Sequence, residues 1–422
     1  MEAINVRSKI VNQIQHMIDN AVIVNRRFLD DEQLIRSEQL TVLEEIFNAN
    51  VRDAEIHEIS SHFAPVLRGD HPVHLALWGK TGTGKTLTMS YFLTLLADMC
   101  RKKSIPMRYE HIDLSTPRPC FRALNDLACL LNASKRYKKG ISLEELMLRI
   151  EAALADYQGY LILFIDEVDN VRRDKDTFLT FLVRRLPQRI PAKLILVFVS
   201  NRLNWSDNLD PRIRSFLKLN ELVFKPYDAV DLQRILSIRV QKALRPGSVG
   251  AGVVEKIAAY ASREHGDARR AVALLARSAY LAEKAGATIT LDLVDQAAGE
   301  IEQDKYITMI RTAPKQLQCA MAGVIRASRS NRNGAVGTGQ AYDAYKITCD
   351  DAGVRPLTGR AFGDLLSELD MYSFLHTRVL SRGRYGRARE ISLDLPEDLA
   401  DKIYDTILVN CDLRPQGGGD RR

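Results

Sequence analysis

A short apolar segment that runs directly into a glycine-rich loop constrains the fold of this chain more than any other feature. The segment 74–78 (HLALW) precedes residues 79–86 (GKTGTGKT), which have the form G-x-x-x-x-G-K-[ST] of a phosphate-binding loop. Its glycines allow successive backbone N–H groups to point at one anion, and the helix expected after it adds a positive dipole end. A glycine- and threonine-rich turn without a ligand is the competing interpretation. The apolar strand before the loop and the helical pattern after it favour a site for a nucleoside triphosphate.

The residue types of the loop predict individual roles. Lys85 is expected to reach the β- and γ-phosphates, and the Thr86 hydroxyl is expected to be a ligand of Mg²⁺. The residues expected to contact the nucleotide are Gly79, Lys80, Thr81, Gly82, Thr83, Gly84, Lys85, Thr86 and Leu87.

A second acidic motif supplies the residues that hydrolysis requires. The continuous apolar run 160–165 is typical of a strand buried on both faces of a parallel sheet, and Asp166 and Glu167 follow it. Asp166 is expected to hold Mg²⁺ together with Thr86, and Glu167 to polarise the attacking water. An acidic surface turn is the weaker alternative.

Further strands and helices complete an α/β core. A third apolar strand, 193–199, leads to Asn201. Its amide is predicted to position the water or to sense the γ-phosphate, and a simple capping role is the alternative. Residues 107–112 form another expected strand, and the segments 121–132 and 142–155 have helical patterns. Alternation of strands and helices predicts a parallel sheet with right-handed βαβ connections.

The segment after Asp228 has only helical periodicity, which predicts an all-helical lid on the α/β core. The expected lid helices are 228–243, 251–264, 268–285 and 291–305. At the other end of the chain, an amphipathic stretch over about 1–22 precedes a helix that ends near Ala49.

The positive charge is concentrated near the C-terminus. The net charge of the chain is +7, and residues 311–389 contain 13 Lys and Arg against 6 Asp and Glu. This segment therefore carries the whole excess, which is typical of a nucleic-acid-binding surface. A solvated basic face is the competing explanation.

The pattern of the same segment favours DNA binding. Helices near 314–328, 339–352 and 358–370 precede two strands, 373–380 and 389–393, which predicts a winged helix-turn-helix whose third helix enters the major groove. The connecting tip, 381–387, is arginine-rich and is expected to contact phosphates or the minor groove. The residues expected to contact DNA are Arg355, Thr358, Arg360, Arg382, Arg384, Tyr385 and Arg387.

Composition limits the class of protein. A chain of 422 residues is long enough for about three domains, and no apolar run reaches the length that spans a bilayer. The N-terminus lacks the apolar core of a signal peptide, so we expect a cytoplasmic, nucleoid-associated protein. The 6 cysteines are scattered without a C-x-x-C pair, which argues against a zinc site or a disulfide framework.

Taken together, these motifs make the chain resemble AAA+ ATPases of the archaeal origin-recognition/Cdc-type replication initiator family, over about residues 10–410. The resemblance is carried by the loop ending in GKT at 84–86 and by the motif DEVD at 166–169. More specific are DPRIRS at 210–215, FKPY at 224–227 and GDARRA at 266–271.

The resemblance implies roles for residues that the motifs alone do not explain. Arg212 resembles the arginine finger that reaches the γ-phosphate of a neighbouring subunit, and Arg214 is the rival. Arg269 resembles the lid arginine that senses the γ-phosphate, and Arg270 is the alternative; Asp267 is positioned to cap that helix. Ile35, near the adenine pocket, and Tyr227, at the lid entrance, complete the expected nucleotide-binding residues.

The family also contains a helical insert that grips the DNA minor groove. The resemblance places this insert at about 114–132, although Pro117 and Pro119 depart from the family pattern at its start. The basic turn 135–139 that follows either reaches DNA or is solvated.

The resemblance predicts a DNA replication initiator with a slow Mg²⁺-dependent ATPase, which binds and deforms double-stranded origin DNA and helps to recruit and load the MCM helicase. Expected partners also include other copies or paralogues of the initiator. Expected domains are 1–226 (AAA+), 227–305 (lid), 306–412 (winged helix) and a tail at 413–422. The alternatives are a general clamp or helicase loader, and a winged-helix regulator with a structural ADP site.

Overall fold

The computed structural model describes residues 21–30, 40–132, 140–331, 335–381 and 387–412. The chain divides into two compact units, Met1–Val294 and Asp295–Arg422, and the division falls inside helix α14 (Leu291–Thr312). The sequence places the end of the lid at residue 305, within the same helix, and this boundary stays a prediction.

The first unit is built around a parallel five-stranded sheet with the strand order β2-β4-β6-β1-β7. Its strands are β1 (His74–Trp78), β2 (Met107–Asp113), β4 (Tyr160–Asp166), β6 (Lys193–Ser200) and β7 (Leu219–Val223). The strands expected around 74–78, 107–112, 160–165 and 193–199 are therefore confirmed. Strand β7 was not predicted from the sequence.

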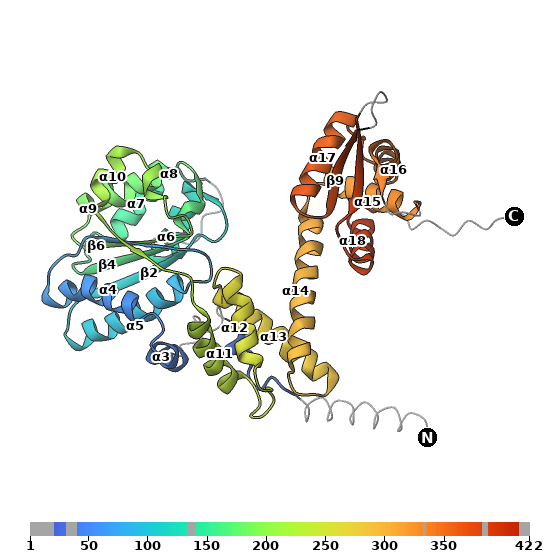
Figure 1. Cartoon of the computed structure of the whole chain (residues 1–422). Helices are drawn as coiled ribbons and strands as arrows, with labels where there is room; N and C mark the ends of the chain where they lie inside the picture. Colours follow the sequence, from blue (N-terminus) through green and yellow to red (C-terminus); the bar gives the residue numbers. More distant parts are fainter. Residues whose placement is uncertain (1–20, 31–39, 133–139, 332–334, 382–386, 413–422) are drawn as a thin grey trace, which may run out of the picture. The chain divides into compact units, whose positions relative to one another are not determined.

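Helices cover both faces of this sheet, as Figure 1 shows. Because side chains alternate along a strand, each strand contributes to two cores. In β1, Leu75 and Leu77 pack on one face with residues of α4 (Asp53–Phe63) and α5 (Lys85–Lys102), whereas Ala76 and Trp78 pack on the other. The helices of that second face are α6 (Cys120–Leu130), α7 (Leu143–Ala153), α8 (Lys175–Thr180), α9 (Leu186–Arg189) and α10 (Pro211–Leu217).

The segment that resembles the DNA-gripping insert is mainly part of this core. Helix α6 buries Ala123, Leu124 and Leu127 completely, so one whole face of it packs on the sheet. The two prolines before it lie outside the helix, and Pro119 belongs to a short strand, β3 (Arg118–Pro119), that pairs with β5 (Val171–Arg173).

The lid is helical, as predicted. It contains α11 (Ala229–Ala243), α12 (Val253–Arg263) and α13 (Ala268–Ala285) in the first unit, followed by α14, which extends seven residues beyond the expected 305 to Thr312. Helix α3 (Leu40–Asn48) packs against α11, and the 3₁₀ turn Arg26–Leu29 contacts α11 and α13.

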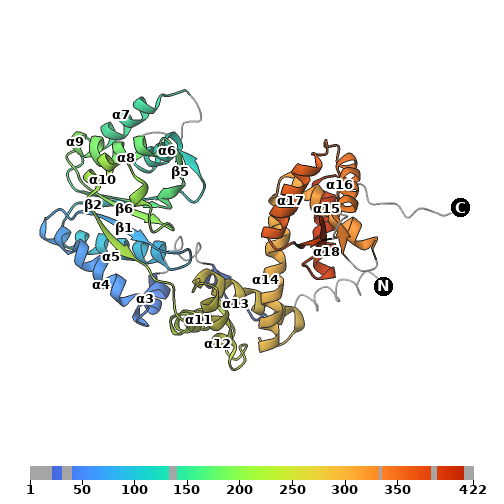
Figure 2. The same ribbon diagram turned by 45° about the horizontal axis from the view of Figure 1, so that its top comes forward.

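The second unit is a three-stranded sheet surrounded by helices, which Figure 2 shows from a second side. Its elements are α15 (Lys315–Arg329), β8 (Val336–Gly337), α16 (Thr338–Asp351), α17 (Gly359–Met371), β9 (Leu375–Ser381), β10 (Arg387–Leu393) and α18 (Glu397–Asn410). Strands β9 and β10 form the expected antiparallel hairpin, from Leu375 opposite Leu393 to Ser381 opposite Arg387. The winged-helix order of three helices and a hairpin is confirmed; β8 and α18 were not predicted.

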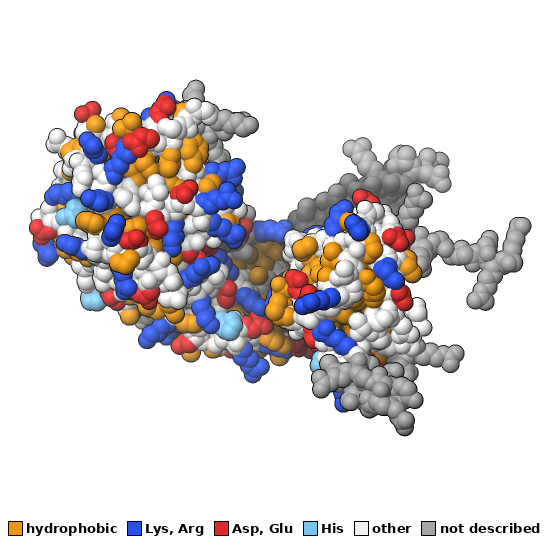
Figure 3. Space-filling model, turned by 90° about the horizontal axis from the view of Figure 1, so that it is seen from above, with side chains coloured by type: hydrophobic (Ala, Val, Ile, Leu, Met, Phe, Trp, Pro, Cys, Tyr) orange, Lys and Arg blue, Asp and Glu red, His pale blue; other side chains and the backbone are white. Residues whose placement is uncertain are grey.

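No helix among the described residues is long and apolar enough to cross a membrane. On the face in Figure 3, basic and acidic side chains are interspersed over both units.

Candidate nucleotide site and DNA-binding surface

The phosphate-binding loop connects β1 to α5 and is held in a shape that only glycine tolerates. Gly82 and Gly84 have φ angles of 73° and 85°. A Cβ atom on Gly82 would lie 1.8 Å from Oδ1 of Asp267, and one on Gly84 would lie 2.2 Å from the Tyr227 hydroxyl. The glycines therefore allow the lid and its entrance to approach the loop closely.

The amino group of Lys85 is hydrogen-bonded to three oxygen atoms beside this loop. Its Nζ donates to the carbonyls of Gly79 (2.8 Å) and Lys80 (2.7 Å) and to Oδ1 of Asn201 (3.0 Å). The residue is only 5% exposed, and burial lowers the pKa of its amino group to about 8. A buried amino group beside a glycine-rich loop suits a phosphate ligand.

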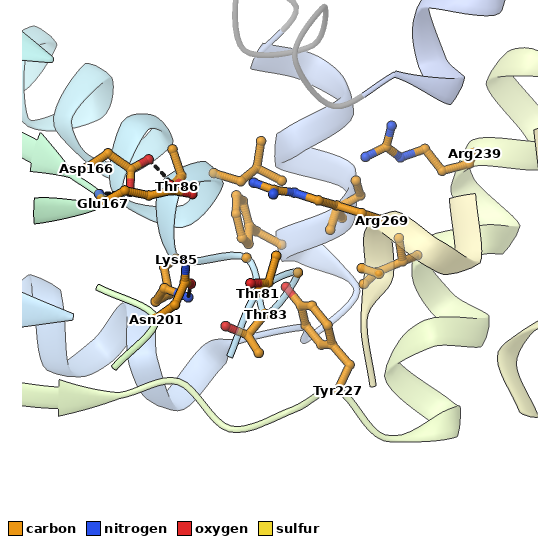
Figure 4. A pocket seen from close by; sticks show the side chains of 17 residues that line it. Thr81, Thr83, Lys85, Thr86, Asp166, Glu167, Asn201, Tyr227, Arg239 and Arg269 are labelled. Atoms are coloured by element: carbon orange, nitrogen blue, oxygen red, sulfur yellow. Dashed lines mark hydrogen bonds between the residues drawn. The ribbon is translucent and has the colours of Figure 1, made fainter. Parts of the chain in front are cut away.

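Thr86 and Asp166 form the candidate Mg²⁺ site. The Thr86 hydroxyl donates to Oδ2 of Asp166 over 2.7 Å, the contact drawn dashed in Figure 4. A hydroxyl and a carboxylate beside a phosphate loop are the oxygen donors that Mg²⁺ takes when phosphates supply the rest of its shell. The residues present therefore fit the ion that the sequence predicts.

Glu167 follows Asp166, lines the same pocket and has a left-handed backbone, with φ of 52°. Burial raises the pKa of the Glu167 carboxyl, and the neighbouring charges of Asp166 and Asp169 add to the effect. A raised pKa makes a carboxylate a better proton acceptor at neutral pH.

Helix α13 of the lid contributes an arginine to the same pocket. Asp267 caps α13 by accepting hydrogen bonds from the backbone N–H groups of Arg269 (2.8 Å) and Arg270 (3.3 Å), as expected. Arg269 lines the pocket (Figure 4). Arg270 instead forms an ion pair with Glu264. The two candidate arginines are thus placed differently, and only Arg269 faces the phosphate loop.

The two candidate arginine fingers lie away from this pocket. Arg212 is exposed in the first turn of α10, whose cap Asp210 accepts a hydrogen bond from the Arg212 N–H over 2.7 Å. Arg214 instead pairs with Asp207 at 3.0 Å. Within one chain neither side chain belongs to the nucleotide pocket.

The structure places most of the predicted nucleotide-binding residues around one cavity, and adds some. Lining residues that the sequence predicts are Thr81, Gly82, Thr83, Gly84, Lys85, Thr86, Leu87, Asp166, Glu167, Asn201, Tyr227 and Arg269. Gly79 and Lys80 are not among the lining residues, and Ile35 lies outside the described residues. Lining residues that sequence analysis missed are Ile46, Phe47, Ile235, Arg239 and Ala268.

Arg52 is a further residue that sequence analysis missed, directly behind the loop. It is 8% exposed, and its Nη2 donates to the carbonyls of Thr83 (2.9 Å) and Lys225 (2.5 Å). Its guanidinium also lies 3.9 Å from the centre of the Tyr227 ring. One arginine thus connects the phosphate loop to the lid entrance. Its Nη1 also pairs with Glu55 at 2.7 Å, but the partners that tie it to the loop and to the lid entrance are far away in the sequence, so no local motif marks its role.

In the second unit, three of the seven residues predicted to contact DNA lie at or just before the N-terminus of α17. Thr358 caps this helix by accepting from the Ala361 N–H over 3.4 Å, and Arg355 and Arg360 are exposed beside it. Arg382, Arg384 and Tyr385 lie outside the described residues, as do the basic turn 135–139 and the side chain of Arg387.

Comparisons with known proteins agree with this geometry. Family models match three successive regions: "AAA domain" at 68–204, "Cdc6 AAA+ ATPase-type lid domain" at 233–299 and "CDC6, C terminal winged helix domain" at 308–402. The chain is 34% identical over 362 residues to the ORC1-type DNA replication protein of Thermococcus kodakarensis, covering 84% of this chain and 86% of the relative. The chain belongs to the ORC1-type DNA replication protein family.

Solved structures of similar proteins have the same fold as this ORC1-type chain. The Aeropyrum pernix ORC1 protein, solved in complex with DNA, is 31% identical, with a TM-score of 0.67 over 85% of this chain and 92% of that one. Cdc6p from Pyrobaculum aerophilum shares the fold, at 22% identity and a TM-score of 0.55, over 93% of this chain and 100% of that one. The family resemblance and the AAA+ fold with a helical lid and a winged helix are thereby confirmed for this ORC1-type chain.

Proposed function

We propose that this ORC1-type chain is an ATP-dependent DNA replication initiator, which binds double-stranded origin DNA, deforms it, and helps to recruit and load the MCM helicase. One observation carries the proposal: a complete phosphate site, built on Lys85, Thr86 and Asp166, shares a chain with a winged helix that presents exposed arginines. The structure of the A. pernix relative in complex with DNA supports DNA as a partner.

The site residues suit a slow ATPase. Thr86 and Asp166 would hold Mg²⁺, which neutralises phosphate charge when bound. Lys85 and Arg269 bind the phosphates, and Asn201, within hydrogen-bond distance of Lys85, orients the water. Glu167 accepts a proton from that water while the bond between the γ-phosphorus and its bridging oxygen breaks. Hydrolysis is slow in a single chain because Arg212 is supplied by another copy.

The first experiment is recovery and sequencing of sheared genomic DNA bound by the purified protein at about 0.15 M salt. Enrichment at one or a few intergenic loci supports an initiator that recognises origins. Even coverage contradicts it and favours a general loader.

Two further measurements test the deformation of DNA and the recruitment of the helicase. Binding to a closed circular plasmid, followed by relaxation with topoisomerase, is expected to change the linking number, and an unchanged number would contradict deformation. Co-purification with the MCM helicase of the same organism is expected on origin DNA and tests recruitment.

A further inference from the structure

The turn between α16 and α17 presents Arg355 at the surface. The turn spans residues 352–358, and Arg355 is exposed shortly before Thr358, the cap of α17. Among the described residues, the guanidinium of Arg355 forms no ion pair or hydrogen bond. Because a proline follows it, the backbone of Arg355 favours an extended conformation. The direction of this guanidinium therefore depends on how the backbone of the turn is held.

Tyr345 of α16 lies directly behind the turn. Its side chain is completely buried, and its ring stacks on that of Phe362 in α17, with ring centres 4.8 Å apart. Its hydroxyl accepts a hydrogen bond from the Leu357 N–H over 3.0 Å and donates one to Oε1 of Gln316 in α15. Burial raises the pKa of this hydroxyl, so the group stays protonated and keeps both hydrogen bonds.

Two further side chains bind the neighbouring peptide groups of the turn. Nε2 of Gln316 donates to the carbonyl of Arg355 over 3.0 Å. The hydroxyl of Tyr342, one helical turn before Tyr345, donates to the Leu357 carbonyl over 2.8 Å. The amide of Gln316 thus connects the buried Tyr345 hydroxyl to the backbone of Arg355. The polar backbone groups on both sides of the proline are fixed from α15 and α16.

We propose that Tyr345 and Gln316 are positioning residues for DNA binding, which fix the backbone of the turn so that the Arg355 guanidinium meets a DNA phosphate. This inference rests on the proposed function, because it takes Arg355 as part of the DNA-binding surface. Tyr345 is buried and acts only through the turn. A cation on a backbone that is already fixed loses less conformational entropy when it binds, which strengthens the contact. Without the Tyr345 hydroxyl, the Leu357 N–H loses its acceptor and the turn is less restrained.

The experiment has to separate positioning from stability, because loss of a buried hydrogen bond destabilises a domain whatever its function. Tyr345→Phe removes the hydroxyl and keeps the stacked ring. Gln316→Met keeps the length of the side chain and removes the amide. Tyr404→Phe is the matched control, because it removes another hydroxyl of the same unit, one that accepts from Nε of Arg326 over 2.7 Å.

Each substitution is made alone and together with Arg355→Ala, and the full chain is titrated with a labelled duplex of random sequence at several salt concentrations. Arg355→Ala is expected to raise the Kd by up to about tenfold and to reduce the slope of log K against log salt by about 0.9. Tyr345→Phe and Gln316→Met are each expected to raise the Kd and reduce the slope in the same direction. In the Arg355→Ala background neither should add to the loss, because the contact that they position is already absent.

Tyr404→Phe is expected to keep the wild-type Kd and slope, although thermal denaturation should show a Tm lowered about as much as in Tyr345→Phe. Equal losses of affinity for Tyr345→Phe with and without Arg355 would overturn the inference. A loss of affinity that follows the Tm across all three variants would overturn it as well.

Arg355→Ala distinguishes failure of the inference from failure of the proposed function. If the wild-type chain does not bind the duplex, the proposed DNA-binding function fails. If Arg355→Ala binds as wild type does, the assignment of Arg355 to the DNA surface fails, and the inference fails with it. If Arg355→Ala weakens binding while Tyr345→Phe and Gln316→Met do not, only the positioning role is wrong.

Discussion

Nζ of Lys85 lies 3.0 Å from Oδ1 of Asn201, so the first residue of α5 is hydrogen-bonded to the residue after β6. Strands β1 and β6 are neighbours in the sheet, and their carboxyl ends therefore meet at the same edge. The contact places the Asn201 amide at the phosphate loop. This supports the predicted role at the nucleotide over a simple helix cap.

Nucleotide affinity is expected to fall as the pH rises above about 8. Burial lowers the pKa of Lys85 to about 8 in the free protein, and a bound phosphate favours the charged form and raises that pKa. Binding above pH 8 must then take up a proton, so the Kd increases by up to about tenfold per pH unit. Titration with a fluorescent ADP analogue at several pH values measures this slope.

The control for this slope is Lys85→Met, which keeps an unbranched side chain without the charge. It is expected to bind far more weakly, with a Kd that does not depend on pH in this range. A pH-independent Kd for the wild type would contradict the assignment of the slope to Lys85.

Arg52→Ala is expected to lower both stability and nucleotide affinity. The substitution removes hydrogen bonds from a buried cation to Thr83 and Lys225 and leaves their carbonyls without this donor. The expected loss in free energy of unfolding is about 3 kcal/mol, a typical value for hydrogen bonds to a charged group. Thermal denaturation with and without ADP measures it.

Arg52→Lys tests whether geometry or charge matters. Lysine keeps the charge but has no planar fork, so it cannot reach both carbonyls and lie over the Tyr227 ring at once. We expect most of the loss to persist. Full recovery in Arg52→Lys would show that charge alone is sufficient.

The nucleotide core was predictable because its signals are local. The strands β1, β4 and β6 are continuous apolar runs, and each is followed directly by its functional residues, so pattern and chemistry coincide in the sequence. Asp267 was found in the same way, because a capping residue lies next to the helix it caps.

The elements that were missed have weaker or non-local signals. Strand β7 has the sequence LNELV at the sheet edge, with a partly exposed pattern, and β8 has only two residues. Arg52 and Arg239 look like ordinary surface residues of amphipathic helices or turns; Arg239 is in fact 2% exposed and donates to the Phe28 carbonyl. Only the folded chain brings such partners together.

Arg269 and Arg270 offer a matched pair of substitutions on one helix turn. Arg269 lines the pocket and Arg270 pairs with Glu264, so Arg269→Ala is expected to weaken ATP binding more than ADP binding. Loss of one charged contact to the γ-phosphate corresponds to about a tenfold change in Kd. Arg270→Ala is expected to bind both nucleotides as wild type does. The reverse pattern would assign the sensor to Arg270.

The double variant Arg355→Ala/Arg360→Ala is expected to weaken DNA binding and its dependence on salt. Each lost phosphate contact reduces the slope of log K against log salt by about 0.9 for duplex DNA. Anisotropy titrations with labelled duplex at several salt concentrations measure that slope. Arg311→Ala, an exposed arginine in the last turn of α14, is the control and should keep the wild-type slope. An unchanged slope in the double variant would remove these residues from the DNA surface.

Mixing of inactive variants tests whether Arg212 acts on another copy. Arg212 is exposed outside the nucleotide pocket of its own chain, so a role at the γ-phosphate requires a neighbour. Arg212→Ala retains the phosphate loop, and Lys85→Ala retains the arginine. Each alone is expected to be inactive on DNA, because an arginine finger contributes a factor of about 10³ or more to hydrolysis.

An equal mixture on DNA is expected to recover activity, since the Arg212 of one variant then faces the intact phosphate loop of the other. Arg214→Ala is the comparison, because Arg214 is paired with Asp207 and is expected to leave hydrolysis nearly unchanged. Activity of Arg212→Ala alone, with loss in Arg214→Ala, would exchange the two roles. If activity is recovered only in the mixture, the active site is formed by residues of two copies. The rate of hydrolysis then measures assembly of the protein on DNA and not nucleotide binding alone.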